Sequence, residues 1–172
     1  IFEIGSPKDI DSVRSSISWT LGANLEALIL TGSNATNGMG NSLNNTITGN
    51  SANNSIDGGN GGTDVLTGLA GADFFCLSSR PFSLRSSAAD HITDFSSAEG
   101  DKIQITKKAF GITESVATLG VVSGVSAIAA GLSTASLFIY DNTSGELYWN
   151  QNGVTKGAGW GGVIAILDNR AT

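Results

Sequence analysis

Apolar residues recur at nine-residue intervals near the start of the chain, separated by small polar residues. Four nonapeptides follow one another: GNSLNNTIT (40–48), GNSANNSID (49–57), GNGGTDVLT (59–67) and GLAGADFFC (68–76), with one extra residue, Gly58, before the third. Each repeat has glycine first, Asn or Asp sixth (Asn45, Asn54, Asp64, Asp73) and an apolar residue eighth (Ile47, Ile56, Leu66, Phe75). A shortened copy, GSNATNGM (32–39), places Asn37 and Met39 in the sixth and eighth roles.

A period of nine indicates six turn residues alternating with a strand of three, each strand pointing one apolar side chain inward. Two nonapeptides then complete one coil of a parallel β-roll, so equivalent turns stack on alternate repeats. This geometry predicts two edges of turns. Asn37, Asn54 and Asp73 line one edge, and Asn45 and Asp64 line the other.

The remaining chain predicts further short strands. Alternation over 11–31 indicates strands of the same stack, and 89–105 indicates two strands around an acidic turn. Strands Leu137–Tyr140 and Glu146–Trp149 form a hairpin, and 163–169 is the last strand. Short helical turns are expected at 127–132 or 134–137. The predicted fold is all-β: a β-roll solenoid of nonapeptide repeats over 1–88 and a β-rich C-terminal cap over 89–172.

Composition narrows the class of partner. Charged residues make up 14% and hydrophobic residues 40% of the chain, which excludes a disordered tail. The net charge of −6, without a Lys/Arg cluster, argues against nucleic acid. No apolar run is long enough for a membrane span. One cysteine, Cys76, leaves packing or metal to stabilise the fold. The first residues lack the basic region of a signal peptide, so a processed start, a fragment and a C-terminal export signal stay open.

The pattern G-x-x-G-x-D supplies hard oxygen ligands for calcium, because the glycine turn directs carbonyls inward and the sixth residue adds a carboxylate. GNGGTDVLT and GLAGADFFC resemble RTX (haemolysin-type) calcium-binding repeats, and the Asn-rich repeats resemble the degenerate copies found beside them. The segment 89–105 and the hairpin resemble serralysin-like RTX C-terminal domains. The resemblance covers roughly 11–169, with 107–136 matched loosely.

This resemblance implies a parallel β-roll, Ca²⁺ in the turns, an extracellular or cell-surface bacterial protein, and export by type I secretion. Carried over position by position, it implies Asp64 and Asp73 as carboxylate ligands and Gly62 and Gly71 as carbonyl ligands. It also implies that the acidic positions of the cap (Asp90, Asp94, Asp101) complete ions at the end of the stack.

The Asn-rich coils depart from that pattern. Asn37, Asn45 and Asn54 stand where Asp would supply charge, so calcium is expected only around 59–76 and in the cap. The neutral amides would instead form a hydrogen-bonded ladder. The alternative for Asp64 and Asp73 is that each merely caps its turn.

Other reactive residues favour no active site. His91 is the single histidine, which excludes the usual hydrolase constellations, and a structural place on a strand face is expected. Cys76 has no activating partner, and Glu99 with Asp101 lies in no apolar cleft. An aromatic set could stack on the sugars of a cell-surface polysaccharide, although packing against the end of the roll is favoured (Tyr148, Trp149, Trp160).

The preferred hypothesis is therefore a secreted, non-catalytic module that calcium folds after export. One alternative is a structural or adhesive subunit that self-associates through the ends of its roll. The other is an ancillary module of a larger secreted hydrolase, whose catalytic residues lie outside this chain.

Overall fold

The computed structural model describes residues 10–78, 88–110, 119–122, 138–149 and 162–169. This part of the chain is all-β apart from one helix of four residues, α1 (Lys107–Phe110). Its strands are β1 (Ser12–Ser15), β2 (Trp19–Thr20), β3 (Ala27–Leu30), β4 (Asn37–Met39), β5 (Thr46–Thr48), β6 (Ser55–Asp57), β7 (Val65–Thr67), β8 (Phe74–Leu77), β9 (Asp90–Ile92), β10 (Lys102–Ile105), β11 (Leu119–Val122), β12 (Phe138–Asp141), β13 (Glu146–Trp149) and β14 (Gly162–Leu167).

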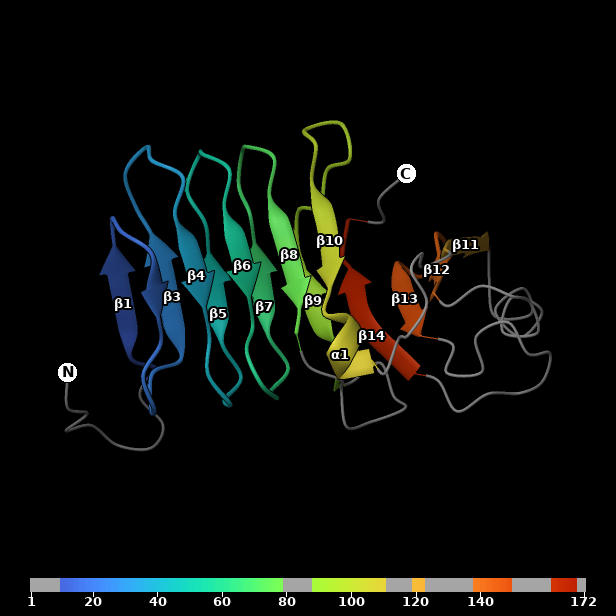
Figure 1. Ribbon diagram of the computed structural model, residues 1–172, viewed down its shortest axis with the longest axis horizontal. Helices are drawn as coiled ribbons and strands as arrows, with labels where there is room; N and C mark the ends of the chain where they lie inside the picture. Colours follow the sequence, from blue (N-terminus) through green and yellow to red (C-terminus); the bar gives the residue numbers. More distant parts are fainter. Residues whose placement is uncertain (1–9, 79–87, 111–118, 123–137, 150–161, 170–172) are drawn as a thin grey trace.

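The strands form two sheets. Sheet A has the order β1-β3-β5-β7-β9-β14-β13-β12-β11, and sheet B has the order β10-β8-β6-β4-β2. From β2 to β10, consecutive strands alternate between the sheets, and neighbours within each sheet run parallel (Figure 1). The short turns between these strands therefore stack in two columns. The A column leads into sheet A, and the B column leads into sheet B.

The predicted inward positions form the core between the sheets. The eighth residues of the four repeats are completely buried: Ile47, Ile56, Leu66 and Phe75. Leu28 and Ile92 continue the same row on sheet A and are also completely buried. Burying one such side chain stabilises the fold by about 1.5–3 kcal/mol, so this row is the main apolar contribution.

The register predicted for the copy before Gly40 is wrong. Gly38, and not Met39, pairs with Ile56 and faces the core, while Met39 is 46% exposed. A Cβ on Gly38 would lie 3.1 Å from Leu28 Cδ2 and 3.2 Å from Ile47 Cγ2. The space at this level is filled because β3 has four residues and buries both Leu28 and Leu30.

This shift changes the edge residues as well. Asn37 pairs with Ser55 and is exposed, so it does not line the edge with Asn54 and Asp73. Thr36 stands in the sixth position instead and is buried.

The strands predicted after the repeats are confirmed. β9 and β10 flank the acidic turn and continue the two sheets by pairing with β7 and β8. β12 and β13 form the expected antiparallel hairpin, and β14 pairs with both β13 and β9. The helical turns expected at 127–132 or 134–137, and Trp160, lie outside the described residues. No helix in the described part of the chain is long and apolar enough to cross a membrane.

Truncation of side chains on β4 and β6 tests the register. Ile56→Ala is expected to lower the free energy of unfolding by about 2–5 kcal/mol because it leaves a cavity in the core. Met39→Ala is expected to change it by less than about 0.5 kcal/mol because the side chain lies on the outer face. Chemical denaturation of both variants measures this, and a large loss in Met39→Ala would contradict the register.

Candidate metal centre

In the A column, side chains at the sixth position link each turn to the next. Asp64 Oδ1 accepts a hydrogen bond from the backbone N–H of Asn45 at 2.8 Å. The N–H of Asp64 donates in turn to Asp90 Oδ1 at 3.0 Å. Asp90 therefore occupies the sixth position of the next coil, although it belongs to no nonapeptide.

The B column has the same arrangement. Asp73 Oδ1 accepts from the N–H of Asn54 at 2.7 Å, and the N–H of Asp73 donates to Asp101 Oδ1 at 2.8 Å. The other oxygen of Asp101 accepts from Ser96 N–H at 2.8 Å. The sequence predicted that Asp64 and Asp73 lie on opposite edges, and the structure confirms it.

The Asn repeats close their turns internally. The N–H of Asn41 donates to Asn45 Oδ1 at 2.7 Å, and the N–H of Asn50 donates to Asn54 Oδ1 at 2.8 Å. In both cases the second residue of the repeat supplies the hydrogen that the sixth side chain needs. The sixth side chain also crosses to the preceding coil, since Asn54 Nδ2 donates to Thr36 O at 2.8 Å. The Asn45 and Asn54 amides thus bond to the backbone of the preceding coil, so the predicted ladder of stacked Asn37, Asn45 and Asn54 amides is wrong.

The Asp repeats use their second residue differently, where Gly58 is counted as the first residue of the third repeat and Gly59 as the second. The N–H of Gly59 donates to Asp57 Oδ1 at 2.9 Å, and the N–H of Leu69 donates to Asp94 Oδ2 at 2.8 Å. The N–H of Leu69, which would otherwise close the turn by donating to Asp73, therefore points to Asp94 instead. Asp73 is completely buried, and its Oδ2 atom has no hydrogen-bond partner.

Backbone conformation separates the two kinds of turn. Gly59, Gly61, Gly62 and Gly71 have φ values between +87° and +125°, and Leu69 has φ +69°. Such values are costly for a residue with a side chain. No residue of the turns 40–45 and 49–54 is in this region. The Asp-containing turns thus reverse several peptide planes that the Asn-rich turns leave in the ordinary orientation.

The first residue of each repeat must be glycine for a packing reason. A Cβ at Gly58 would overlap Asp64 Oδ2, and one at Gly68 would overlap Asp73 Oδ2. Gly58 therefore holds the first position of the third repeat, and the extra residue lies within its turn. The sixth carboxylate is held against bare backbone, which excludes water from that side.

Burial disfavours the charged form of these carboxylates. It raises the pKa of Asp73 from 3.8 to about 6, and the nearby charge of Asp101 adds to this rise. Burial likewise raises the pKa values of Asp64 and Asp90. The segment 27–79, which carries Asp64 and Asp73, contains no Lys, Arg or His, whereas His91 lies beside Asp90 and partly offsets the rise of its pKa.

The predicted ligands gather unevenly. Asp94 and Asp101 both reach the turn that carries Asp73, since Asp94 Oδ1 also accepts from Gly68 N–H at 2.9 Å. Gly62 lies against the carbonyl of Leu43 and beside Asp64, and Gly71 lies against the backbone of Ala52. In the described part of the chain, no three acidic, histidine or cysteine side chains are arranged to hold a metal ion by themselves. Backbone carbonyls would have to complete any coordination shell.

Sequence reasoning missed Asn41, Asn50 and Asp57. The repeated GNS at 40–42 and 49–51 was the available signal for the two asparagines. Asp57 is 9% exposed and also accepts from Ser78 Oγ at 2.9 Å. Its contacts depend on the longer third turn, for which the extra Gly58 was the available signal.

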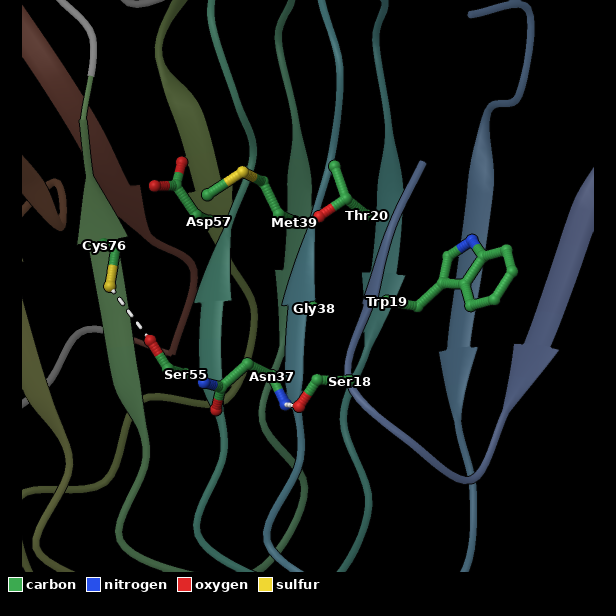
Figure 2. Close-up of a pocket in the computed structure, with 9 residues that line it drawn as sticks. All are labelled: Ser18, Trp19, Thr20, Asn37, Gly38, Met39, Ser55, Asp57 and Cys76. Atoms are coloured by element: carbon green, nitrogen blue, oxygen red, sulfur yellow. Dashed lines mark hydrogen bonds between the residues drawn. The ribbon is translucent and has the colours of Figure 1, made fainter. Parts of the chain in front are cut away.

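A cavity of about 290 Å³ opens on the outer face of sheet B, away from Asp64 and Asp73. Figure 2 shows its side chains, which come mainly from β2, β4, β6 and β8, with Trp19 pointing away from the others. The Sγ atom of Cys76 is within hydrogen-bond distance of Ser55 Oγ, at 3.3 Å. Burial raises the pKa of the Cys76 thiol, which keeps it protonated. This cavity thus brings no reactive group to the turns.

The remaining candidate residues have structural contacts. His91 lies on a strand, as predicted, and its Nδ1 is 2.8 Å from Asp168 Oδ1. Trp149 packs edge-on against Phe110 at 5.5 Å between ring centroids, and Tyr148 donates to Glu146. The contacts of His91 and Trp149 join the C-terminal strands to β9 and α1, whereas the bond of Tyr148 lies within β13.

Comparison with known proteins adds no relative: no family model, curated protein or solved structure matches the chain.

The buried carboxylates predict an unusual pH dependence. Asp73 binds its proton more tightly in the folded chain than in the unfolded chain, so deprotonation favours unfolding. In calcium-free buffer, the free energy of unfolding is expected to fall as pH rises from about 4 to about 6. Urea titrations at pH 4, 5, 6 and 7 measure this. A free energy that rises across that range would contradict the assignment.

Proposed function

We propose that the chain is an extracellular calcium-binding module of the RTX type, folded as a parallel β-roll and without catalytic activity. The observation that carries the proposal is the Oδ2 atom of Asp73, a buried carboxylate oxygen with no hydrogen-bond partner. An anionic oxygen in that state is costly unless a cation binds it.

The surrounding residues fit calcium better than a transition metal. Asp73 Oδ2 is the open carboxylate oxygen, while Asp94 and Asp101 already accept hydrogen bonds from backbone N–H groups. Turn carbonyls would supply further donors, and all of these groups are hard oxygens. His91 and Cys76 are engaged elsewhere. Calcium tolerates backbone carbonyls and irregular shells, which suits turns with reversed peptide planes.

A second position lies in the A column. Asp64 and Asp90 are joined through the Asp64 N–H, and the carbonyl of Leu43 lies against Gly62 beside them. Burial and their mutual repulsion raise the pKa of Asp64, which a bound cation would reverse. We propose this pair as a second calcium position.

The β-roll itself is part of the proposal. Support comes from the alternation of strands between two parallel sheets and from stacked turns joined 19 residues apart. Calcium that binds the folded chain alone would stabilise it by about 2.7 kcal/mol when free calcium is 100 times Kd. A chain that is loose where calcium is scarce and compact where it is abundant suits type I secretion to the cell exterior.

The test is Asp73→Asn, compared with wild type in EGTA and in millimolar calcium. The substitution removes the buried charge but keeps the shape, so the melting temperature in EGTA should stay equal or rise. The calcium-induced increase in melting temperature should be mostly lost. Asp11→Asn is the matched control, because Asp11 directly precedes β1, at one end of sheet A and away from the turns that carry Asp64 and Asp73, and it should keep the full increase.

Two results would count against calcium. An identical wild-type melt in EGTA and calcium would contradict the proposal and favour the structural or adhesive alternative. An undiminished calcium response in Asp73→Asn would remove Asp73 from the site.

A further inference from the structure

The side chain of Asn41 joins its turn to the preceding turn of the A column. Its Nδ2 donates to the carbonyls of Gly22 at 2.7 Å and Leu25 at 2.8 Å. Its Oδ1 accepts from the N–H of Leu43 at 2.8 Å, which fixes the orientation of the amide. One NH₂ group therefore satisfies two carbonyl oxygens that converge between successive turns.

Asn50 repeats this arrangement in the B column. Its Nδ2 donates to Asn34 O at 2.9 Å and lies 3.4 Å from Thr31 O. Its Oδ1 accepts from Ala52 N–H at 3.0 Å. Asn50 is 5% exposed, so these bonds are shielded from water. The two columns thus have the same internal donor at the same position of the repeat.

The donor is missing in the next turn of each column. Gly59 follows Asn41 and Leu69 follows Asn50 at the second position, and neither side chain can donate. Both residues have positive φ and direct their N–H groups to Asp57 and Asp94. The sixth position changes in the same turns from neutral Asn45 and Asn54 to Asp64 and Asp73.

We propose that Asn41 and Asn50 determine which turns need a cation. Their NH₂ groups present positively polarised hydrogens to converging carbonyls, the role that a calcium ion has in the Asp turns. The coils from β1 to β6 are therefore held without metal, whereas those from β7 to β10 depend on it. The second half of this inference rests on the proposed calcium function, and the first half does not.

Charge burial supports the division. Asn45 and Asn54 are 1% and 2% exposed, like the aspartates that replace them, but as neutral amides they carry no charge to be desolvated. The turns 40–45 and 49–54 are each closed by the N–H of their own second residue, Asn41 and Asn50. Nothing in these turns thus requires a positive ion.

Hydrogen exchange read by mass spectrometry on the whole chain tests this, in EGTA and in millimolar calcium. Peptides within 27–57 should be protected in both buffers. Peptides within 64–77 and 90–105 should be protected in calcium, and their protection should fall at least about tenfold in EGTA. Loss of protection over 27–57 in EGTA would overturn the inference and leave the calcium function standing. Equal protection everywhere in both buffers would instead contradict the calcium function.

Substitutions separate cation replacement from simple structural support. The double substitution Asn41→Asp and Asn50→Asp keeps the shape of the side chains. It replaces each NH₂ donor with a carboxylate oxygen, an acceptor, that faces the same carbonyls. Protection over 27–57 should fall about tenfold or more in EGTA and recover in calcium, because a cation can then take the amide's place. Asn37→Ala, on the exposed face of β4, is the control and should leave protection over 27–57 unchanged in both buffers. Unchanged protection, or a loss that calcium does not restore, would overturn the role of the two amides.

Discussion

The hydrogen bond from the backbone of one turn to the side chain of the next controls most of this structure. Asn45 donates to Asp64 and Asp64 to Asp90 in one column, and Asn54 donates to Asp73 and Asp73 to Asp101 in the other. Because each bond joins residues of successive coils, it fixes the register of the strands between them. The buried row from Leu28 to Ile92 can form only when that register holds. The same bond buries the carboxylate, so the stacking of the coils and the burial of charge have one origin.

The burial of charge is thus graded along the fold. Neutral amides close the first turns, and carboxylates replace them from Asp64 onward. Asp57 and Asp94 take the second-position N–H groups away from the sixth side chains of the Asp turns. The carboxylates are consequently held in place by donors on one oxygen while the other oxygen of Asp73 stays open. A preorganised oxygen of this kind lowers the ordering that a bound ion would require.

The sequence allowed the repeat, the inward residues and the opposite placement of Asp64 and Asp73 to be predicted, since all follow from a period of nine. The register of Met39 could not be predicted from that period, because it depends on the fourth residue of β3 and on how Leu28 and Leu30 fill the core. The contacts of Asn41 and Asn50 depend on where turn carbonyls point, which spacing does not reveal. The contact of Asp57 with Gly59 arises from the seven residues between β6 and β7.

The alternation of strands between the two sheets limits how such a chain can change length. Removing one nonapeptide would move every later strand to the opposite sheet. Each later turn would then stack in the other column, against turns with which it does not now form hydrogen bonds. Removing two would return each strand to its own sheet, one coil closer to the start. Insertions and deletions among the repeats of natural variants should therefore come in whole coils of 18 or 19 residues, the spacing of the bonds between the turns of Thr36, Asn54 and Asp73. The unit that can be inserted or deleted in this architecture is therefore the coil, even though the repeat visible in the sequence is half a coil.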